Sequence, residues 1–296
     1  MFTLAHLTDP HLSPLPKPRL TQLAGKRLVG YVNWKLRRHM HHDAAALAEI
    51  ERDLLAHNPD HIAVLGDLIN ICLPAEFPRA AEFLARLGSP RDVTLVPGNH
   101  DSYVRSQAYT YLKYWGDYIQ GDTPTNNIAE RFPFVRRRGP IALIGLSTGH
   151  PTLPFLASGT LGPHQLERLA ILLREIESEG LFRVVLIHHP PAGLRPPHKL
   201  LTDAAAFCEI IAAHGAELIL HGHDHKHSQL ALEGPRGEVP LIGLPSASTP
   251  GSDGYPAAWN LYRIGGAPGA WTCEMETRGL LPVGTVASIE KKRLFG

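Results

Sequence analysis

The sequence predicts an α/β protein in which two packed sheets carry helices on their outer faces. Two observations lead to this fold class. Short apolar runs rich in Val, Ile and Leu alternate with helical patterns over residues 2–222, and only strand patterns follow after residue 226. Alternation of strands and helices that closes with consecutive strands is the pattern expected when two sheets pack together with helices outside.

Six apolar runs indicate buried strands, because their hydrophobic residues are nearly continuous rather than alternating. They are residues 2–7, 61–69, 92–98, 141–147, 183–189 and 216–222. Four further strand patterns follow, at residues 228–234, 239–248, 257–266 and 271–279. These four supply the consecutive strands of the prediction.

Three segments have apolar residues at three- and four-residue spacing, which is the period of an amphipathic helix. They are residues 43–58, 162–180 and 202–215. Asp43 is placed to cap the first helix, and Gly180 and Gly215 are placed to end the other two. No internal repeat or low-complexity linker divides the chain, so we expect a single domain over residues 1–296, with an insertion at 13–42.

Composition is that of an ordinary globular protein. Lys and Arg number 29 and Asp and Glu 28, so the overall charge gives no argument for a nucleic-acid partner, and none is expected. The cysteines Cys72, Cys208 and Cys273 are too far apart for a zinc ribbon and odd in number for a disulfide framework. No leader precedes the first strand and no run reaches about 18 apolar residues, so we expect a cytoplasmic protein.

Polar residues stand where the predicted strands end. They are Asp9 and His11, then Asp67, then Asn99, His100 and Asp101, then His188, and finally His223 and His225. The carboxyl ends of strands line the ligand crevice of open α/β sheets, so we expect these side chains to form one site. This set of carboxylates, amide and imidazoles is too large for one metal ion. It suits two ions that share a carboxylate and lie about 3.5–4 Å apart.

The same residues fall in five short motifs in a fixed order, namely DPH (9–11), GD (66–67), GNHD (98–101), HHPP (188–191) and GHDH (222–225). This series resembles the calcineurin-like metallophosphoesterases, and in particular their bacterial class III cyclic-nucleotide phosphodiesterase branch. The resemblance implies a four-layer α/β/β/α sandwich of two mixed sheets. That architecture agrees with the fold class expected from the strand and helix patterns.

The resemblance also implies a role for each residue. Asp9, His11 and His225 would hold one metal ion, Asn99, His188 and His223 would hold the other, and Asp67 would bridge the two. His100 would stay uncoordinated as a catalytic acid, and Asp101 would orient it.

A phosphodiesterase is the expected activity. The substrate would be a cyclic nucleotide or a glycerophosphodiester, attacked by a metal-bridging hydroxide, and the cofactors would be two divalent transition-metal ions. Mn, Fe, Zn and Co all suit such ligands. The alternative is a phosphoesterase or pyrophosphatase that acts on a lipid-linked or nucleotide substrate at a membrane surface.

A serine hydrolase is a less favoured alternative. The sequence GLSTG at 145–149 matches the G-x-S-x-G nucleophile elbow, which would make Ser147 the nucleophile. That motif requires a helix directly after the serine, whereas HPTLPF follows here at 150–155 and its two prolines oppose a helix. We therefore expect Ser147 to lie at a strand end or in a loop.

The insertion at 13–42 is basic and amphipathic. It carries seven Lys and Arg residues, no acidic residue, and interleaved apolar residues that include Tyr31 and Trp34. Such a segment can cap the active site and meet the substrate's phosphate, or it can lie in a membrane interface. The second role would place the protein in peripheral contact with the inner membrane.

Overall fold

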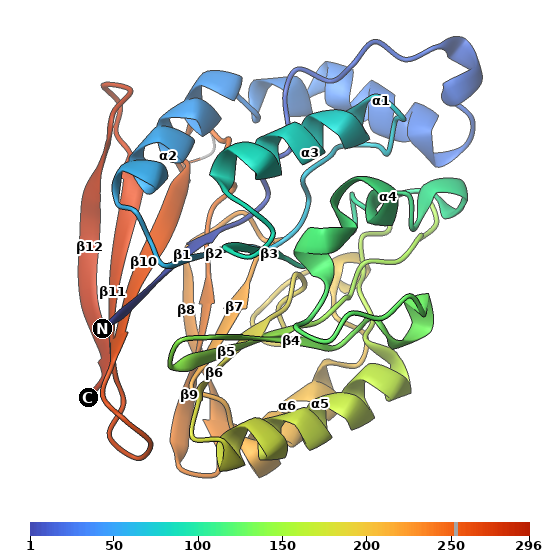
Figure 1. Ribbon diagram of the computed structural model, residues 1–296. Coiled ribbons are helices and arrows are strands. Elements are labelled where there is room, and N and C mark those ends of the chain that lie inside the picture. Colours follow the sequence, from blue (N-terminus) through green and yellow to red (C-terminus); the bar gives the residue numbers. More distant parts are fainter. Residues whose placement is uncertain (252–253) are drawn as a thin grey trace.

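The computed structural model describes residues 1–251 and 254–296. It contains two six-stranded sheets packed face to face, with helices over the outer face of each (Figure 1). These four layers confirm the expected α/β/β/α sandwich. Both chain ends lie on the same side of the molecule (Figure 1).

The first sheet has the strand order β12-β11-β10-β1-β2-β3. Its members are β1 (Phe2–Leu7), β2 (His61–Val64), β3 (Val93–Leu95), β10 (Ala258–Gly265), β11 (Thr272–Leu280) and β12 (Val286–Phe295). β1, β2 and β3 are parallel, whereas β10, β11 and β12 pair antiparallel. Leu7 pairs with Val64 and Val64 pairs with Leu95, so the three parallel strands end at the same edge of the sheet.

The second sheet has the strand order β4-β5-β6-β7-β9-β8. Its members are β4 (Phe134–Arg138), β5 (Ile141–Gly145), β6 (Phe182–Leu186), β7 (Leu218–His221), β8 (Ser228–Gly234) and β9 (Gly237–Gly243). The four central strands β5, β6, β7 and β9 are parallel, and the outer strands β4 and β8 are antiparallel to their neighbours. The sheet is therefore mixed, as the sequence predicts.

Helices fill the two outer layers. The α-helices are α1 (Lys26–Leu36), α2 (Ala44–Ala56), α3 (Glu76–Leu87), α4 (Tyr111–Trp115), α5 (Gly162–Ser178) and α6 (Ala204–His214). Short 3₁₀ turns lie at Leu20–Gln22, Arg38–Met40, Arg105–Gln107, Gly116–Ile119, Ile128–Glu130 and Pro197–Lys199. α2 and α3 cover the first sheet, and α5 and α6 cover the second (Figure 1). Asp43 caps α2 as expected, since its Oδ1 accepts a hydrogen bond of 2.8 Å from the Ala45 amide.

One apolar core joins the two sheets. Leu4 and Val64 of the first sheet belong to the same cluster of buried side chains as Leu143, Val184 and Leu220 of the second. Full burial of one such side chain stabilises a fold by about 1.5–3 kcal/mol. The sheets are therefore held at a fixed spacing, which fixes the loops at their ends.

The strand predictions are right in place but too long at the carboxyl ends. The run at 61–69 continues as an apolar segment, yet β2 ends at Val64. Leu65, Leu68 and Ile69 stay buried as loop residues beside Asp67. These loop residues are buried without pairing in the sheet, so the apolar pattern extends beyond the end of the strand.

Five elements lie outside the sequence-based prediction, and the helices α1 and α4 are two of them. β4 has the sequence FVRRR, and β12 carries a run of mostly exposed residues, so neither has the apolar pattern of a buried strand. Both are edge strands, where charged side chains are common. α3 has the apolar spacing of an amphipathic helix, with Phe77, Ala80, Phe83, Leu84 and Leu87 buried, and the sequence-based prediction missed it.

Two expectations from composition can be compared with the structure. Cys72, Cys208 and Cys273 are all free thiols, in line with the absence of a disulfide framework. Among the residues that the structure describes, no helix combines the length and apolar character needed to cross a bilayer.

Candidate metal centre

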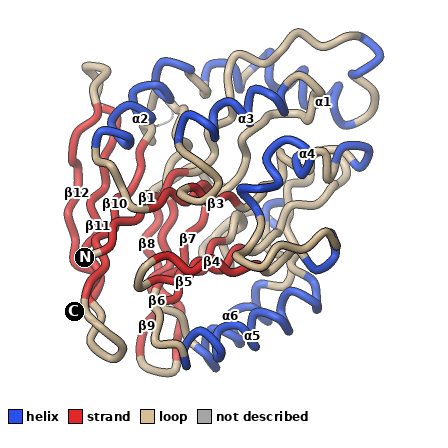
Figure 2. The backbone as a smooth tube through the Cα atoms, viewed as in Figure 1, coloured by secondary structure: helices blue, strands red, loops and turns tan. Residues whose placement is uncertain are grey.

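All the residues singled out as ligands follow the carboxyl ends of parallel strands. Asp9 and His11 follow β1, Asp67 follows β2, Asn99 follows β3, His188 follows β6, and His223 and His225 follow β7. Both sheets therefore contribute loops to one side of the molecule, the side on which α1 and α4 lie (Figure 2). The predicted convergence of these loops is what the structure has.

The backbone of these loops is held in an uncommon conformation. Five of the seven residues have positive φ, namely Asp9 (52°), His11 (37°), Asp67 (54°), His223 (71°) and His225 (53°). A left-handed non-glycine residue costs on the order of 1–3 kcal/mol and persists where the surrounding contacts impose it. Such strain concentrates at functional sites, and here it falls on the predicted ligands.

Two motif glycines are required by close packing around the carboxylates. A Cβ on Gly98 would lie 2.2 Å from Oδ1 of Asp67, and a Cβ on Gly222 would lie 2.6 Å from Oδ2 of Asp9. Both distances are far below any real contact of a Cβ atom. The glycines of the GNHD and GHDH motifs thus leave room for the two aspartates.

The first group of donor atoms comes from Asp9, His11 and His225. Nε2 of His225 lies 3.2 Å from Oδ1 of Asp9 and 3.3 Å from Nε2 of His11. Oδ2 of Asp9 accepts hydrogen bonds from the Thr8 hydroxyl at 2.6 Å and the His223 amide at 3.0 Å. The other carboxylate oxygen is thereby turned toward the two imidazoles.

The second group comes from Asn99, His188 and His223. Oδ1 of Asn99, Nε2 of His188 and Nε2 of His223 are buried and have no hydrogen-bond partner among the described residues. Nδ1 of His188 lies 2.6 Å from the Leu65 carbonyl, to which it donates, so Nε2 is the nitrogen left to face the other donor atoms. Buried acceptor atoms without partners are rare and costly, and these three match a cation site.

Asp67 lies between the two groups. Its Oδ2 is 3.7 Å from Nε2 of His11 and 3.5 Å from Nε2 of His188, while its Oδ1 accepts a hydrogen bond of 2.7 Å from the His100 amide. Donor atoms of Asp9, Asp67 and His188 all lie within 4.8 Å of one another. One carboxylate oxygen therefore faces donors of both groups.

The electrostatics of these buried residues favour a bound cation. Burial raises the pKa values of Asp9 and Asp67, but the neighbouring histidines outweigh burial and hold both pKa values below their usual range. Burial lowers the pKa of His188, but the carboxylates of Asp67 and Asp9 outweigh it and raise that pKa to about 10. Two buried carboxylates thus attract positive charge into this space.

Asp101 does not orient the His100 ring as the sequence-based interpretation expected. Its carboxylate accepts hydrogen bonds from the backbone amides of Asp67 (2.8 Å), Leu68 (3.0 Å) and Gly98 (2.9 Å). Asp101 therefore fixes the loops that carry Asp67 and Asn99. The side chains of adjacent residues 100 and 101 point to different partners.

The His100 ring is instead held by Asn70 and Arg38. Its Nδ1 makes a short hydrogen bond to the Asn70 carbonyl, and its Nε2 accepts one of 2.9 Å from Nη1 of Arg38. Burial, followed by the charge of Arg38, lowers the pKa of His100 to about 3. A neutral imidazole with its Nε2 lone pair on Arg38 has no proton to donate there, so this geometry opposes the general-acid role.

Arg38 and His42 are at the site but were not among the expected site residues. Nη2 of Arg38 lies 3.1 Å from Nε2 of His11 and 3.4 Å from Nε2 of His42. No carboxylate pairs with Arg38 among the described residues. Both come from the end of the 13–42 insertion, and the excess of basic residues there was the only sequence signal for them.

The sequence model of the calcineurin-like phosphoesterase family matches residues 2–227, about three quarters of the chain. The chain belongs to this family. As a calcineurin-like phosphoesterase it is a metal-dependent hydrolase of phosphoric esters. Its His and Asp clusters are the groups that could hold the metal.

Two curated relatives come from cyanobacteria. A protein of Synechococcus sp. strain WH7803, named as a probable cyclic nucleotide phosphodiesterase, is 27% identical over 247 residues, or 77% of this chain and 82% of its own. A second, from Synechococcus sp. strain ATCC 27144, carries the same description and is 26% identical over 239 residues, 77% of this chain and 80% of its own. The chain is thus similar to the cyclic-nucleotide phosphodiesterase-like branch.

Solved structures share the fold at low sequence identity. A dimetal phosphatase from Danio rerio superposes with a TM-score of 0.65 at 15% identity, covering 97% of this chain and 98% of its own. A purple acid phosphatase from yellow lupin superposes with a TM-score of 0.55 at 10% identity, covering 94% of this chain and 51% of its own. These likenesses establish the metallophosphoesterase fold.

A cavity of about 960 Å³ opens onto the metal centre of this phosphoesterase. Asp67, Asn99, His100 and His223 line it on the side of the strand ends. α1 lines another side, and residues 155–157 with Lys199 also line it. The insertion therefore borders the space in which a substrate would meet the metal centre.

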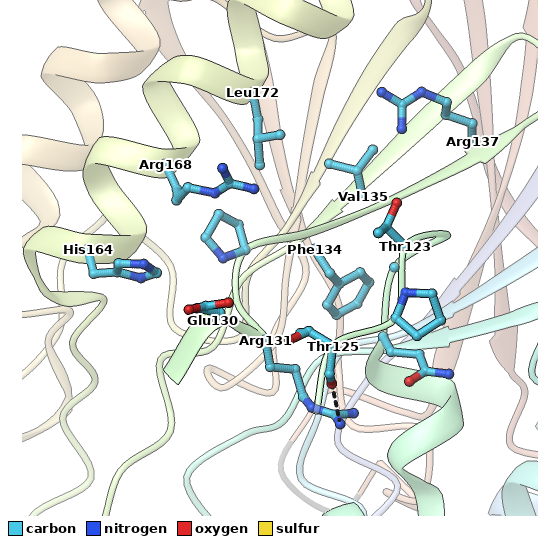
Figure 3. Close-up of a pocket in the computed structure, with 14 residues that line it drawn as sticks. Thr123, Thr125, Glu130, Arg131, Phe134, Val135, Arg137, His164, Arg168 and Leu172 are labelled. Carbon is cyan, nitrogen blue, oxygen red and sulfur yellow. Dashed lines mark hydrogen bonds between the residues drawn. The ribbon is translucent and has the colours of Figure 1, made fainter. Parts of the chain in front are cut away.

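A second cavity of about 550 Å³ lies between the segment 120–137 and α5. Figure 3 shows His164 and Arg168 of α5 on one side of it and Arg131, which donates to the Thr125 carbonyl at 3.2 Å, on another. None of the predicted ligands lines it. This cavity is therefore separate from the metal centre.

Ser147 lies at the end of β5 and is not followed by a helix, since α5 begins only at Gly162. Its amide and carbonyl both bond to the side chain of Gln165, at 2.9 and 2.7 Å. The strand-turn-helix geometry of a nucleophile elbow is absent from residues 145–160. Ser147 thus lies where the sequence predicted, at a strand end.

Proposed function

We propose that the protein is a dinuclear-metal phosphodiesterase. Asp9, His11 and His225 would hold one ion, Asn99, His188 and His223 the other, and Asp67 both. The observation that carries this proposal is the trio of buried atoms without partners, Oδ1 of Asn99 and Nε2 of His188 and His223. The position of Asp67 between the groups supports a shared ligand.

Divalent ions held by these ligands would supply a water nucleophile at neutral pH and neutralise charge on the phosphoryl oxygens. The ligand set suits Mn, Fe, Zn or Co. Some of these ligands are already oriented by a second contact. Asp9 is held by Thr8 and His188 by the Leu65 carbonyl, and such contacts fix the direction of the lone pairs that a cation needs.

Arg38 would bind the phosphate. Its guanidinium lies at the metal centre and is hydrogen-bonded only to imidazole nitrogens, and no carboxylate forms an ion pair with it among the described residues. A phosphoryl oxygen is a stronger partner for guanidinium than a neutral imidazole. His100 would keep Arg38 in place through Nε2, and Asp101 would keep the Asp67 and Asn99 loops in place.

The insertion at 13–42 would act as a cap beside the metal centre. Nε of Arg27 donates to the Ile71 carbonyl at 3.2 Å and its Nη2 to the Cys72 carbonyl at 2.5 Å, which ties α1 to the loop after Asp67. Lys26 donates to the Thr152 hydroxyl at 2.6 Å. These contacts hold α1 against the protein, and Lys26 itself lines the cavity, which favours a cap over a free membrane anchor.

A phosphodiester is the favoured substrate, of the cyclic-nucleotide or glycerophosphodiester type. The names of the two Synechococcus relatives support a diester. Turnover of bis-p-nitrophenyl phosphate and p-nitrophenyl phosphate should be compared with the same metal loaded. We expect the diester to be cleaved faster, and a monoester preference above about tenfold would overturn the proposal.

A further inference from the structure

One face of α1 exposes aliphatic side chains to the cavity. Leu28, Val32 and Leu36 follow one another at four-residue intervals and are 50%, 46% and 67% exposed. At about 100° per residue they lie within one narrow stripe of the helix. All three line the 960 Å³ cavity that opens onto the metal centre.

The opposite face of α1 is used to pack the helix against the protein. Tyr31 and Trp34 are partly buried against the main apolar core. Gly30 is buried in close contact with its surroundings, since a Cβ there would lie 2.5 Å from the Tyr103 hydroxyl. The helix therefore has two apolar faces, and its packing holds the stripe of Leu28, Val32 and Leu36 toward the cavity.

Another wall of the cavity repeats this chemistry. Phe155 is 80% exposed and has a φ of 68°, a left-handed conformation that is rare for a bulky residue. Leu156 beside it also lines the cavity. Lys26 donates to the Leu156 carbonyl at 3.3 Å, which joins this wall to α1.

We infer that the substrate is a phosphodiester carrying a long alkyl or acyl chain, which lies along Leu28, Val32 and Leu36 while the phosphate reaches the metal centre. The inference rests on the proposed function, and of the two substrate types named there it selects the glycerophosphodiester type over the cyclic nucleotide. Exposed aliphatic side chains that open onto a catalytic centre lose contact with water when an apolar chain covers them, which makes the chain's binding favourable.

A flexible chain fits this wall better than a nucleobase does. Bases are recognised by stacking on aromatic rings and by hydrogen bonds to their edges. The α1 stripe offers three aliphatic side chains and neither of those features, while the rings of Tyr103 and Phe155 line other parts of the cavity. The cations near the phosphate end, Arg38 and Lys199, suit the anionic head of an amphiphile.

Binding of n-alkyl phosphonates tests the inference without any turnover. Methyl, butyl, hexyl and octyl phosphonate would be titrated by calorimetry, below their micelle concentrations. Each methylene that leaves water should tighten binding about fourfold. The heat capacity change should also become more negative with chain length, as for burial of apolar surface.

The Leu28→Gln/Leu36→Gln variant would remove the apolar stripe. Gln and Leu have similar helix propensity, and both sites are exposed, so α1 should stay folded. The gain per methylene should fall to about 1.5-fold or less. Leu20→Gln is the matched control, because Leu20 lies in the same insertion, is 90% exposed and does not line the cavity.

A second arm uses p-nitrophenyl alkyl phosphates, which share one leaving group. If the protein does not cleave even the methyl ester, that result counts against the proposed function. The phosphonate titration would still test whether the α1 stripe binds an alkyl chain. A wild-type affinity that does not change with chain length would overturn the inference. A second result would also overturn the inference: the wild type binds phosphatidylglycerol vesicles, the double variant does not, and phosphonate affinity does not depend on chain length. The stripe would then contact membrane rather than substrate.

Discussion

Oδ2 of Asp67 lies 3.5 Å from Nε2 of His188, across the boundary between the two sheets. Asp67 follows a strand of the first sheet and His188 a strand of the second. Neither sheet alone carries both groups of donor atoms, so the centre exists only when the sheets are packed. Metal that binds this centre binds the folded chain in preference to the unfolded one and must therefore stabilise it.

Replacement of Asp67 tests the shared ligand. Asp67→Ala should reduce the metal content from close to two ions per chain to well below one, because both groups lose a ligand. Chelation should lower the melting temperature of the wild type and change that of the variant little. Elemental analysis and thermal unfolding measure these effects, with Glu82→Ala as an exposed carboxylate control. A full metal complement in Asp67→Ala would contradict the bridging role.

Arg38 should matter for phosphate rather than for metal. Arg38→Ala should keep its metal but weaken inhibition by inorganic phosphate and raise KM by about tenfold to a hundredfold, since a hydrogen bond to a charged group contributes about 1.5–3 kcal/mol. Inhibition constants and metal content should be measured together. Lys35→Ala, which removes an exposed cation of the same insertion, is the control. Loss of metal in Arg38→Ala with unchanged phosphate affinity would refute the assignment.

In the proposed site His100 acts by positioning Arg38. The loss of activity in His100→Ala should therefore not depend on the leaving group of the substrate. His100→Ala should lower kcat/KM equally for methyl p-nitrophenyl phosphate and for a dialkyl phosphate, whose alkoxide needs a proton to depart. The metal content should not change. A loss at least tenfold larger for the dialkyl ester would instead establish His100 as the general acid, in spite of its neutral state here.

The sequence allowed the grouping of the ligands to be predicted but not all of their surroundings. Asp67 and His188 could be placed at one edge because parallel strands end together, a rule that needs only the strand pattern. Arg38 comes from an insertion whose position depends on tertiary contacts such as those of Arg27 with the loop after Asp67. No local pattern encodes such contacts.

The roles of His100 and Asp101 show a second limit. Adjacency in the sequence placed both residues at the site, yet Asp101 turns to backbone amides and His100 to Asn70 and Arg38. Side-chain direction depends on φ and ψ in loops, and these loops hold strained conformations that no propensity predicts.

Asp53 should make stability depend on acid pH at a place far from the metal centre. Asp53 of α2 accepts hydrogen bonds from Arg278 (2.7 Å) and Trp259 (2.9 Å), which tie the outer helix to the first sheet. Burial raises the pKa of Asp53, but these hydrogen bonds outweigh burial and hold the pKa below its ordinary value of 3.8. A carboxyl with a depressed folded pKa stabilises the fold above its unfolded pKa. That contribution should be lost as the pH falls below about 5.

Urea unfolding of Asp53→Asn and wild type at several pH values measures this contribution. At pH 7 the variant should be less stable by about 1–3 kcal/mol, since it loses hydrogen bonds to a charged acceptor. The difference should shrink as the pH falls from about 5 toward 3. In this range the Asp53 carboxyl binds a proton more readily in the unfolded wild type than in the folded one, so protonation stabilises the unfolded state. Glu49→Gln removes an ion pair with Arg52 that lies at the surface of the same helix, and it should cost less than about 1 kcal/mol at any pH. A stability gap for Asp53→Asn that does not change with pH would show that Asp53 contributes through packing alone.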